Sequence, residues 1–392
     1  MALRTLLVAG LATSATAAKL LVSGYAKGEG SNGTVLTLDY PSLKTVSTNS
    51  KLGPQPTWLD TSLYREGLVL GLDEAWATPD KAGLYSLKKG ANGALDVAGF
   101  ATVLGGPVST QFYNKKQAVA IAHYGGGAIS TFTVSKDGAF TPLQNVTYGA
   151  EGHGPGAGQT TSHVHHAVLD PTQSYLVFPD LGLDATHVFC IDPKTNKLTA
   201  HADLKAAPGA GPRHAAFWKS GNKTFLFIVH ELNNSLVSYE VTYLPNGGGL
   251  SFKQIDSKST YGDKPAPAGA AAGEIQVSPD NKFVLASNRN ATLQNVPNPN
   301  PANATQVPSD SIVTFKPSPD GKLEFVQLAP SGGKFPRHFS TNKDGSLVAV
   351  ANQQSFSVDV YQRDVKTGLL GKKVSSAFDL PSSPNNVLFV DE

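Results

Sequence analysis

The chain has 392 residues, 40% of them hydrophobic and 16% charged, with 32 basic against 30 acidic side chains. This composition supplies a large apolar core and argues against disorder, and the balanced charge argues against nucleic-acid binding, which needs a basic surplus. The 39 glycines and 26 prolines favour many turns and short strands over long helices.

The N-terminal segment is typical of a secretory signal peptide. Arg4 gives it a positive start, residues 6–12 form an apolar stretch, and small residues follow at 15–18. We therefore predict that residues 1–18 are removed and that residues 19–392 form one secreted, extracellular domain. The apolar stretch is much shorter than the roughly 20 residues that span a bilayer, so no membrane anchor is expected.

Six Asn-x-Ser/Thr sequons agree with secretion. They lie mostly in Gly-, Pro- and Asn-rich segments, and they are the predicted glycosylation sites: Asn32, Asn145, Asn222, Asn233, Asn290 and Asn303. The single cysteine, Cys190, lies in an apolar run and is expected to be a buried structural thiol.

Seven apolar, strand-like runs recur at intervals of 48 to 64 residues, beginning at Leu20, Leu68, Ala118, Tyr175, Phe225, Phe283 and Leu347. Such periods are typical of propellers and solenoids. In each unit a second strand-like run follows, then a turn such as Asp137-Gly138, a more polar run, and a run that leads into the next unit. Four strands in each of seven units, without helical periodicity, predict an all-β, seven-bladed β-propeller.

The chain ends fit a closed ring. Residues 386–390 resemble the run that precedes each repeat, and the domain starts with the run that follows it. We therefore expect the N- and C-terminal strands to complete the last blade together, which removes an open sheet edge. The alternatives are a β-helix, which needs a shorter repeat, and two sandwiches, which would not give seven matched units.

Aligned repeats place polar residues at two equivalent positions. Six residues after the opening residue lie Glu74, Tyr124, Leu181, Glu231, Arg289 and Gln353. Ten residues before it lie His165, Gly273 and Arg337, and Arg213 joins them if a two-residue insertion is allowed. We expect both sets to line one mouth of the central channel. Arginines bind carboxylates or an oxyanion, and a His beside a Glu moves protons; the competing interpretation is a set of salt bridges between blades.

The run from Ser162 to His166 has three histidines and could indicate a metal site. Strand alternation puts His163 and His165 on one face, where both could bind a metal ion, and His166 on the other face. The alignment of His165 with two arginines argues for anion or proton chemistry instead, so we predict no metal and no cofactor. Residues 152–156 are glycine-rich but lack the lysine of a phosphate loop, and no Gly-x-Ser-x-Gly motif occurs.

At these residues the chain resembles the lactonase family with a seven-bladed propeller fold, which includes bacterial 6-phosphogluconolactonases and fungal carboxy-cis,cis-muconate cyclases. The resemblance spans residues 20–390, and its motifs are His163-Val164-His165-His166, Pro179-Asp180-Leu181-Gly182, Gly211-Pro212-Arg213-His214, Glu231-Leu232, Ser287-Asn288-Arg289, Pro336-Arg337-His338-Phe339 and Ala351-Asn352-Gln353. It implies catalytic roles for a His, two Arg and a Glu, which map onto His165, Arg213, Arg289 and Glu231. His163 is the competing histidine. We expect the substrate-binding residues to be His163, His214, Arg337, Glu74 and Gln353.

The chain departs from the intracellular members of that family in its signal segment, its sequons and an insertion at residues 290–310, which we expect to cover one channel mouth. These departures argue against phosphosugar and muconate substrates, which are mainly cytosolic metabolites.

Three hypotheses result. The first is an extracellular lactonase for sugar-derived aldonolactones, in which Glu231 or His165 activates water. The second is a cyclase of the carboxymuconate type, and the third is a non-catalytic, ligand-binding secreted propeller. In each case we expect a monomer with a small lactone or anionic ligand and no nucleic-acid or membrane partner. If His165 is the base, activity should fall on the acid side of a pKa near 6.5.

Overall fold

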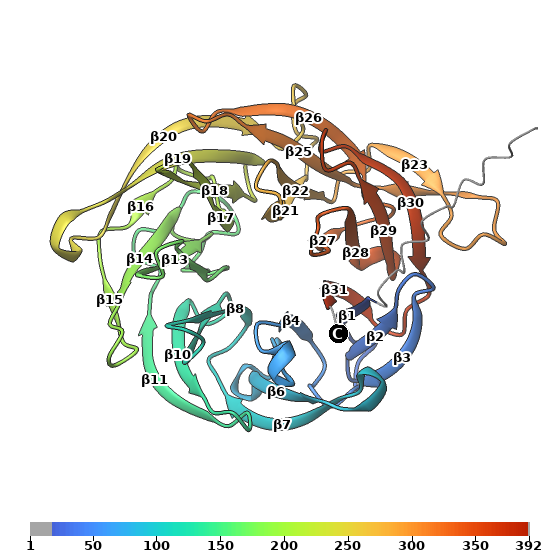
Figure 1. The fold of residues 1–392 in the computed structure, drawn as a ribbon, viewed down its shortest axis with the longest axis horizontal. Coiled ribbons are helices and arrows are strands. Elements are labelled where there is room, and N and C mark those ends of the chain that lie inside the picture. Colours follow the sequence, from blue (N-terminus) through green and yellow to red (C-terminus); the bar gives the residue numbers. More distant parts are fainter. Residues whose placement is uncertain (1–17, 391–392) are drawn as a thin grey trace, which may run out of the picture.

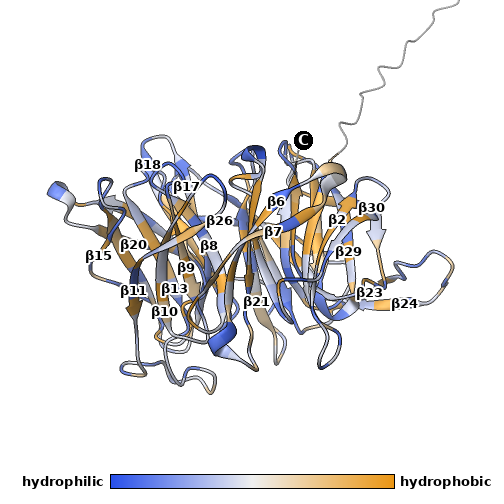
Figure 2. Cartoon of the chain, turned by 90° about the horizontal axis from the view of Figure 1, so that it is seen from below, coloured by the Kyte–Doolittle hydropathy of each residue, from blue (hydrophilic) through white to orange (hydrophobic). Residues whose placement is uncertain are grey.

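The computed structural model describes residues 18–390, in which seven antiparallel sheets are arranged in a ring around a common axis (Figure 1). The seven-bladed β-propeller predicted from the repeats is confirmed. Seen edge-on, apolar residues run through the sheets between two more polar rims (Figure 2). The predicted signal segment lies outside the described residues, except for residue 18.

The blades are numbered in chain order. Blade 1 joins β31 (Ser383–Val390) to β1 (Lys19–Tyr25), β2 (Thr34–Asp39) and β3 (Lys44–Asn49). Blade 2 contains β4 (Pro56–Asp60), β5 (Leu68–Asp73), β6 (Gly83–Lys89) and β7 (Leu95–Thr102). Blade 3 contains β8 (Pro107–Tyr113), β9 (Ala118–His123), β10 (Ala128–Val134) and β11 (Phe140–Thr147).

Blade 4 contains β12 (Val168–Leu169), β13 (Tyr175–Asp180), β14 (Ala185–Ile191), β15 (Leu198–Ala200) and β16 (Leu204–Lys205); its outer strand is split in two. Blade 5 contains β17 (Pro212–Ser220), β18 (Lys223–His230), β19 (Ser235–Tyr243) and β20 (Leu250–Ser259). Blade 6 contains β21 (Ala271–Val277), β22 (Val284–Arg289), β25 (Ser311–Pro317) and β26 (Leu323–Pro330). Blade 7 contains β27 (Pro336–Thr341), β28 (Leu347–Asn352), β29 (Ser357–Arg363) and β30 (Leu370–Ala377).

Short 3-10 helices occur in the connections, at Tyr64–Glu66, Pro79–Lys81, Ala91–Gly93, Pro245–Gly247 and Gln353–Ser355. Across residues 18–390 none of the helices has the length and apolar character needed to cross a membrane.

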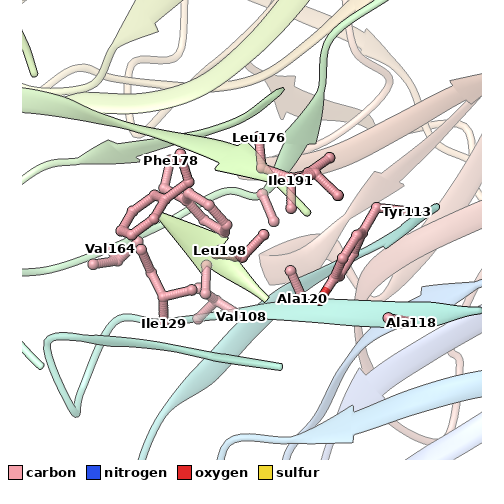
Figure 3. Close-up of a cluster of buried hydrophobic side chains, with 13 residues drawn as sticks. Val108, Tyr113, Ala118, Ala120, Ile129, Val164, Leu176, Phe178, Ile191 and Leu198 are labelled. Atoms are coloured by element: carbon pink, nitrogen blue, oxygen red, sulfur yellow. The ribbon is translucent and has the colours of Figure 1, made fainter. Parts of the chain in front are cut away.

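The core lies between blades, with one apolar cluster at each of the seven interfaces between neighbouring blades. The cluster between blades 3 and 4 packs Ile129 of β10 against Phe178 and Leu198 of blade 4 (Figure 3). Because each sheet is covered on both faces, successive residues of an inner strand serve opposite interfaces. Leu21 of β1 faces blade 2, whereas its neighbour Leu20 faces blade 7. This is why the opening strand of each repeat is apolar throughout.

The predicted ring closure is present. β31 pairs along its length with β1, from Lys19 opposite Val390 to Tyr25 opposite Ser383. The last strand in the chain is therefore the innermost strand of the first blade, and the sheet order β3-β2-β1-β31 leaves no unpaired strand facing the channel in that blade.

The insertion at residues 290–310 does not cover the channel mouth, contrary to expectation. It forms a separate hairpin of β23 (Gln294–Pro297) and β24 (Gln306–Ser309), which projects outward from the ring (Figure 1). Its base is fixed at Asp310, whose carboxylate accepts hydrogen bonds from the backbone N–H of Asn290, Ala291 and Phe335. These bonds direct the hairpin away from the axis.

The six sequon asparagines are all exposed, as glycan acceptors must be. Cys190 is only half-buried, not fully buried as expected, and its thiol donates to the carbonyl of Ile191 at 3.9 Å.

Candidate functional site

Each blade bends its innermost strand at the same place, through a β-bulge. A bulge puts two residues of one strand opposite one residue of its partner and redirects their side chains. The one-residue register shift falls between Pro56 and Leu59, Pro107 and Ser109, Pro212 and His214, Ala272 and Ile275, Pro336 and His338, and between β1 and β31 at Ser23 and Gly24. In blade 4 the pairs Val164–Asp180 and Val168–Val177 show the same shift.

The bulges turn consecutive side chains toward the axis. Three pairs of neighbours, Thr57-Trp58, Arg213-His214 and Arg337-His338, line one small cavity together with His165, Glu274 and Asn385. The space available to the centre of a water molecule is about 10 Å³, which is room for one water. The predicted column at His165, Arg213, Gly273 and Arg337 is therefore the column of bulge residues.

Strand alternation gave a wrong prediction for His166. It was expected on the face opposite His165, but both rings contact His214, with centroids 4.9 Å away for His165 and 4.2 Å away for His166. The bulge lets both rings reach His214 of blade 5, although only His165 lines the cavity.

The other predicted column follows the second strand of each blade. The backbone N–H groups of Glu74, Tyr124, Leu181, Glu231 and Gln353 donate to the carbonyls of Gln55, Gly106, His163, Gly211 and Phe335, each two residues before a bulge residue. This repeated bond holds the two columns side by side. In blade 1 the equivalent residue is Tyr25, opposite Ser383; it lies five residues after Leu20 instead of six, so the sequence alignment missed it.

Glu231 holds two arginines together at the mouth. Its Oε2 lies 2.8 Å from Nε of Arg213 and 2.7 Å from Nη2 of Arg289. Arg289 also donates to the carbonyl of Ala272 at 2.9 Å, and its guanidinium lies over the ring of Phe335. The catalytic Arg–Glu–Arg set expected from the sequence is therefore brought together from blades 5 and 6.

A second ion pair crosses the mouth. Nη2 of Arg337 in blade 7 lies 2.9 Å from Oε1 of Glu74 in blade 2. The other oxygen of Glu74 accepts from the indole N–H of Trp76. The Trp76 ring packs edge-on to Tyr124, and Tyr124 in turn packs edge-on to His165 and stacks on His163. Salt bridges between blades thus exist, as the competing interpretation held.

The ion pairs at the channel mouth do not use all the hydrogen-bond donors of its arginines. Three arginines form ion pairs there with two carboxylates, Glu74 and Glu231, while the third carboxyl group of the site, Glu274, contacts His214 and His338 instead. In addition, Nη1 of Arg213 and Nε of Arg289 are buried without a hydrogen-bond acceptor among residues 18–390. Buried guanidinium N–H groups without acceptors are costly. The mouth is therefore suited to an additional anion or to an oxygen atom that becomes negative.

Gly273 makes room for this arrangement. It occupies the bulge position that carries arginine in blades 5 and 7, and a Cβ there would lie 2.6 Å from Oγ of Ser287 and 3.2 Å from Nε of Arg289. The absent side chain leaves the space into which Arg289 reaches from its own strand.

The pKa shifts separate the two candidate bases. Burial would raise the pKa of Glu231, but Arg289 and Arg213 lower it below its ordinary value, so this carboxylate is a weak base. Burial, together with Arg213 and Arg337, lowers the pKa of His165 well below its ordinary value. His165 is therefore neutral at physiological pH, and the expected acid limb near 6.5 does not belong to it.

His165 has a free ring nitrogen on the channel side. Its Nδ1 contacts Nε2 of His214 at 3.1 Å, while its Nε2 has no hydrogen-bond partner in the described part of the chain and is not sealed from the cavity. His163 is half-buried, with Nδ1 against the carbonyl of Tyr124 at 2.9 Å. His165, which lies among the arginines, is the better candidate for the base.

Two of the expected substrate-binding residues are held in different ways. His214 lines the cavity, and both its ring nitrogens are engaged, by His165 and by Oε2 of Glu274, each at 3.1 Å. Gln353 is fixed through its backbone, and its side-chain amide has no hydrogen-bond partner among the residues that the structure describes. Sequence reasoning missed Glu274, which follows the glycine of the bulge column and so carried no visible signal.

Within residues 18–390 no three His, Cys, Asp or Glu side chains are arranged to hold a metal ion. Independence of metal and of cofactor remains a prediction.

Fold and site together define a class of protein: a closed seven-bladed propeller with three arginines, two carboxylates and a neutral histidine at its channel mouth. The family model described as "Lactonase, 7-bladed beta-propeller" matches residues 19–389, and the chain belongs to this family.

Individual relatives agree. A probable 6-phosphogluconolactonase of Arthroderma benhamiae is 27% identical over 337 residues, which are 86% of this chain and 80% of that protein. The 6-phosphogluconolactonase of Bacillus subtilis is 28% identical over 266 residues, 67% of this chain and 68% of that protein. The solved structure of a periplasmic gluconolactonase of Pseudomonas aeruginosa matches with a TM-score of 0.75 and 25% identity, over 95% of this chain and 99% of that one. These relationships support hydrolysis of lactone esters as the general activity.

Proposed function

We propose that the protein is an extracellular lactonase that hydrolyses sugar-derived aldonolactones. The observation that carries this proposal is the pair of buried guanidinium N–H groups without acceptors, on Arg213 and Arg289, together with the free Nε2 of His165, which lines the same cavity as Arg213. Hydrolysis of a lactone puts negative charge on its carbonyl oxygen as water attacks, and donors placed in advance at that oxygen stabilise the transition state.

The residues divide the work as follows. Nε2 of His165 accepts a proton from the attacking water, and Arg213 and Arg289 stabilise the oxyanion. Glu231 orients both arginines through its Oε2, and it is a positioning residue because its own basicity is low. Arg337 is held by Glu74 and, after burial and Arg213, helps to lower the pKa of His165.

Trp76 supports a sugar as the substrate. Its side chain is 42% exposed, yet the ring is fixed by Glu74 through the indole N–H and by Tyr124 edge-on. A rigid, half-exposed indole offers flat apolar area beside polar groups, which suits the C–H face of a sugar ring. We expect Trp76→Ala to raise KM for a disaccharide aldonolactone by about tenfold and to change kcat little, since that loss corresponds to about 1.4 kcal/mol of binding.

The cyclase alternative is less well supported. A carboxymuconate carries three carboxylates, whereas two carboxylates of the protein already neutralise most of the charge of the three arginines. Too little positive charge therefore remains to bind three substrate carboxylates.

An extracellular location is supported by the signal-like segment at residues 1–18 and by the exposure of all six sequon asparagines. It is also the reason to prefer unphosphorylated aldonolactones to the phosphorylated sugar lactone of the relatives' names.

The test is acid release from a lactone panel: gluconolactone, a disaccharide aldonolactone, 6-phosphogluconolactone and a carboxymuconolactone, each corrected for spontaneous hydrolysis. We expect turnover of the unphosphorylated sugar lactones, and no loss of activity in EDTA. Activity confined to the phosphorylated or muconate compound would reject the proposed substrate, and activity that EDTA abolishes and metal restores would reject the assigned roles.

A further inference from the structure

A line of buried hydrogen bonds leads from the channel into the interior. Nδ1 of His165 lies 3.1 Å from Nε2 of His214, and Nδ1 of His214 lies 3.1 Å from Oε2 of Glu274. All three side chains are buried, and they come from blades 4, 5 and 6. One end of the line is the free Nε2 of His165, and the other end is the carboxyl group of Glu274, which is 2% exposed and lies at the wall of the same small cavity.

The line has two self-consistent arrangements of protons while both histidines are neutral. With Glu274 ionised, Nδ1 of His214 donates to it, Nδ1 of His165 donates to Nε2 of His214, and Nε2 of His165 carries a lone pair. With Glu274 protonated, every donor and acceptor exchanges roles, and Nε2 of His165 carries a hydrogen. The other oxygen of Glu274 accepts from the N–H of Ile275 at 3.0 Å in both arrangements.

We propose that His214 and Glu274 form a proton relay that lets His165 act first as a base and then as an acid without becoming charged. The relay rests on the proposed lactone hydrolysis and concerns the same site. His165 is the catalytic residue, and His214 and Glu274 act through it as positioning and relay residues.

Electrostatics explain why such a relay is needed. A proton held on His165 as an imidazolium would be buried and would face Arg213, Arg337 and Arg289; burial first, and then these arginines, lower the pKa of this histidine. Passing the charge inward avoids this repulsion. Burial raises the pKa of Glu274 to about 8, although the field of Arg213 opposes the change, so this carboxylate is a good final acceptor.

The histidines around Glu274 stay neutral. Burial and Arg213 lower the pKa of His214, which also faces His165, His166 and His338. His338 lies 3.5 Å from Glu274, and its Nδ1 accepts from the N–H of Val387, so its hydrogen is on Nε2 and points to the carboxylate. His338 is a side branch, because it has no hydrogen bond to His165 or His214 among the described residues.

The reaction balances in two steps. Water gives a proton to Nε2 of His165 and its hydroxide adds to the lactone carbonyl, while Nδ1 of His165 passes a proton to His214 and Nδ1 of His214 passes one to Glu274. When the ring C–O bond breaks, Nε2 of His165 gives its proton to the leaving oxygen, and the relay returns to its first state. No proton is gained or lost by the protein.

The direct test is a titration of His165 by NMR with ¹⁵N-labelled histidine, its signals identified by comparison with His165→Gln. We expect the hydrogen to move from Nε2 to Nδ1 as the pH rises through the pKa of Glu274, about 8, with no imidazolium in that range. In Glu274→Gln, which keeps the shape but holds no extra proton, the exchange should be absent. A wild-type His165 that keeps one tautomer throughout, or one that exchanges equally in Glu274→Gln, would overturn the relay.

Activity gives a second readout. The relay can accept a proton only when Glu274 is ionised, so kcat/KM should rise with pH and level off above about 8. Glu274→Gln should lower kcat by about 10²-fold with little change in KM, and should abolish this pH dependence. His214→Phe, which keeps a ring against His166 and Trp58, should do the same.

His123→Gln is the control. It removes a buried histidine of blade 3 that is bonded to Leu104 and Ser130 and does not line the cavity, so it should keep the rate within about threefold and keep the rise with pH. Glu274→Gln with the wild-type pH profile would overturn the relay even where lactonase activity stands. Absence of wild-type activity on every lactone would instead reject the proposed function, and the NMR titration would still decide the relay.

Discussion

Arg213 is 2% exposed and yet part of its guanidinium has no acceptor among residues 18–390. A structural arginine at such depth is normally fully hydrogen-bonded. Nε of Arg363 in blade 7 also lacks an acceptor, so what distinguishes the channel mouth is that two such arginines, Arg213 and Arg289, share one carboxylate there.

We predict that Arg213→Ala and Arg289→Ala each lower kcat by about 10²-fold or more, the usual effect of removing an oxyanion donor. The control is Arg363→Ala. Arg363 is equally buried and lies 3.5 Å from Asp280, but it belongs to the outer part of blade 7. It should lower thermal stability and leave kcat per folded molecule unchanged. Unchanged kcat in both channel variants would reduce those arginines to ties between blades.

The roles of His165 and Glu231 predict an order of effects. His165→Gln removes the base and should lower kcat by about 10³-fold. Glu231→Gln keeps a side chain of the same shape but loosens two arginines, so its loss should be smaller and should include a rise in KM. Steady-state kinetics at saturating and limiting lactone measure both. A larger loss in Glu231→Gln would make Glu231 the base.

At the scale of the element, the decisive feature is the bulge in each innermost strand. The repeats predicted which residues meet, because equivalent positions in a ring face a common axis. They did not predict that Glu274 and His338 line the same cavity, because the alternation rule holds only in a strand without a bulge.

The insertion is a case in which the sequence did not predict the position of a segment. We expected residues 290–310 to cover one channel mouth, but they form a hairpin that projects outward from the ring (Figure 1). The direction of the hairpin depends on three backbone N–H groups that donate to the carboxylate of Asp310. No sequence pattern in residues 290–310 predicts these hydrogen bonds.

Gly273→Ala tests the bulge directly. The new methyl group would displace Oγ of Ser287, which accepts from the N–H of Glu274, and would crowd Arg289. We expect about 1–3 kcal/mol less stability by thermal or denaturant unfolding, and a fall in kcat of about tenfold as the guanidinium shifts. Gly28→Ala is the control, since no atom lies within 4 Å of its new Cβ; it should match the wild type. Full activity in Gly273→Ala would show that Arg289 does not need this space.

At the scale of the whole molecule, seven interfaces share the apolar core almost equally, so no disulfide is required to hold the ring. Fold and ring closure were predictable because an inner strand buried on both faces is continuously apolar, and that signal recurs seven times.

The predicted signal peptide and glycosylation sites determine what mass the secreted protein should have. Secreted from a eukaryotic host, the protein should begin at or near Lys19, the first residue of β1, and should carry N-linked glycans on exposed sequon asparagines. Intact mass spectrometry before and after enzymatic removal of glycans measures both. An exported protein that retains residues 1–17 would refute the signal peptide, and an unchanged mass after glycan removal would refute glycosylation.

Closure of the ring by β31 also means that blade 1 cannot be completed until the end of the chain has been synthesised. The edge of β1 that faces the channel can be paired only after residues 383–390 have been made, yet blade 1 begins at the other end of the domain. From the end of β3 at Asn49 to Ser383 there are 334 residues, so at about 5–20 residues per second the edge waits roughly 20 to 70 s during synthesis. For that interval an apolar strand edge is free to pair with another nascent chain. The yield of native protein should therefore depend on how sparsely ribosomes occupy the message.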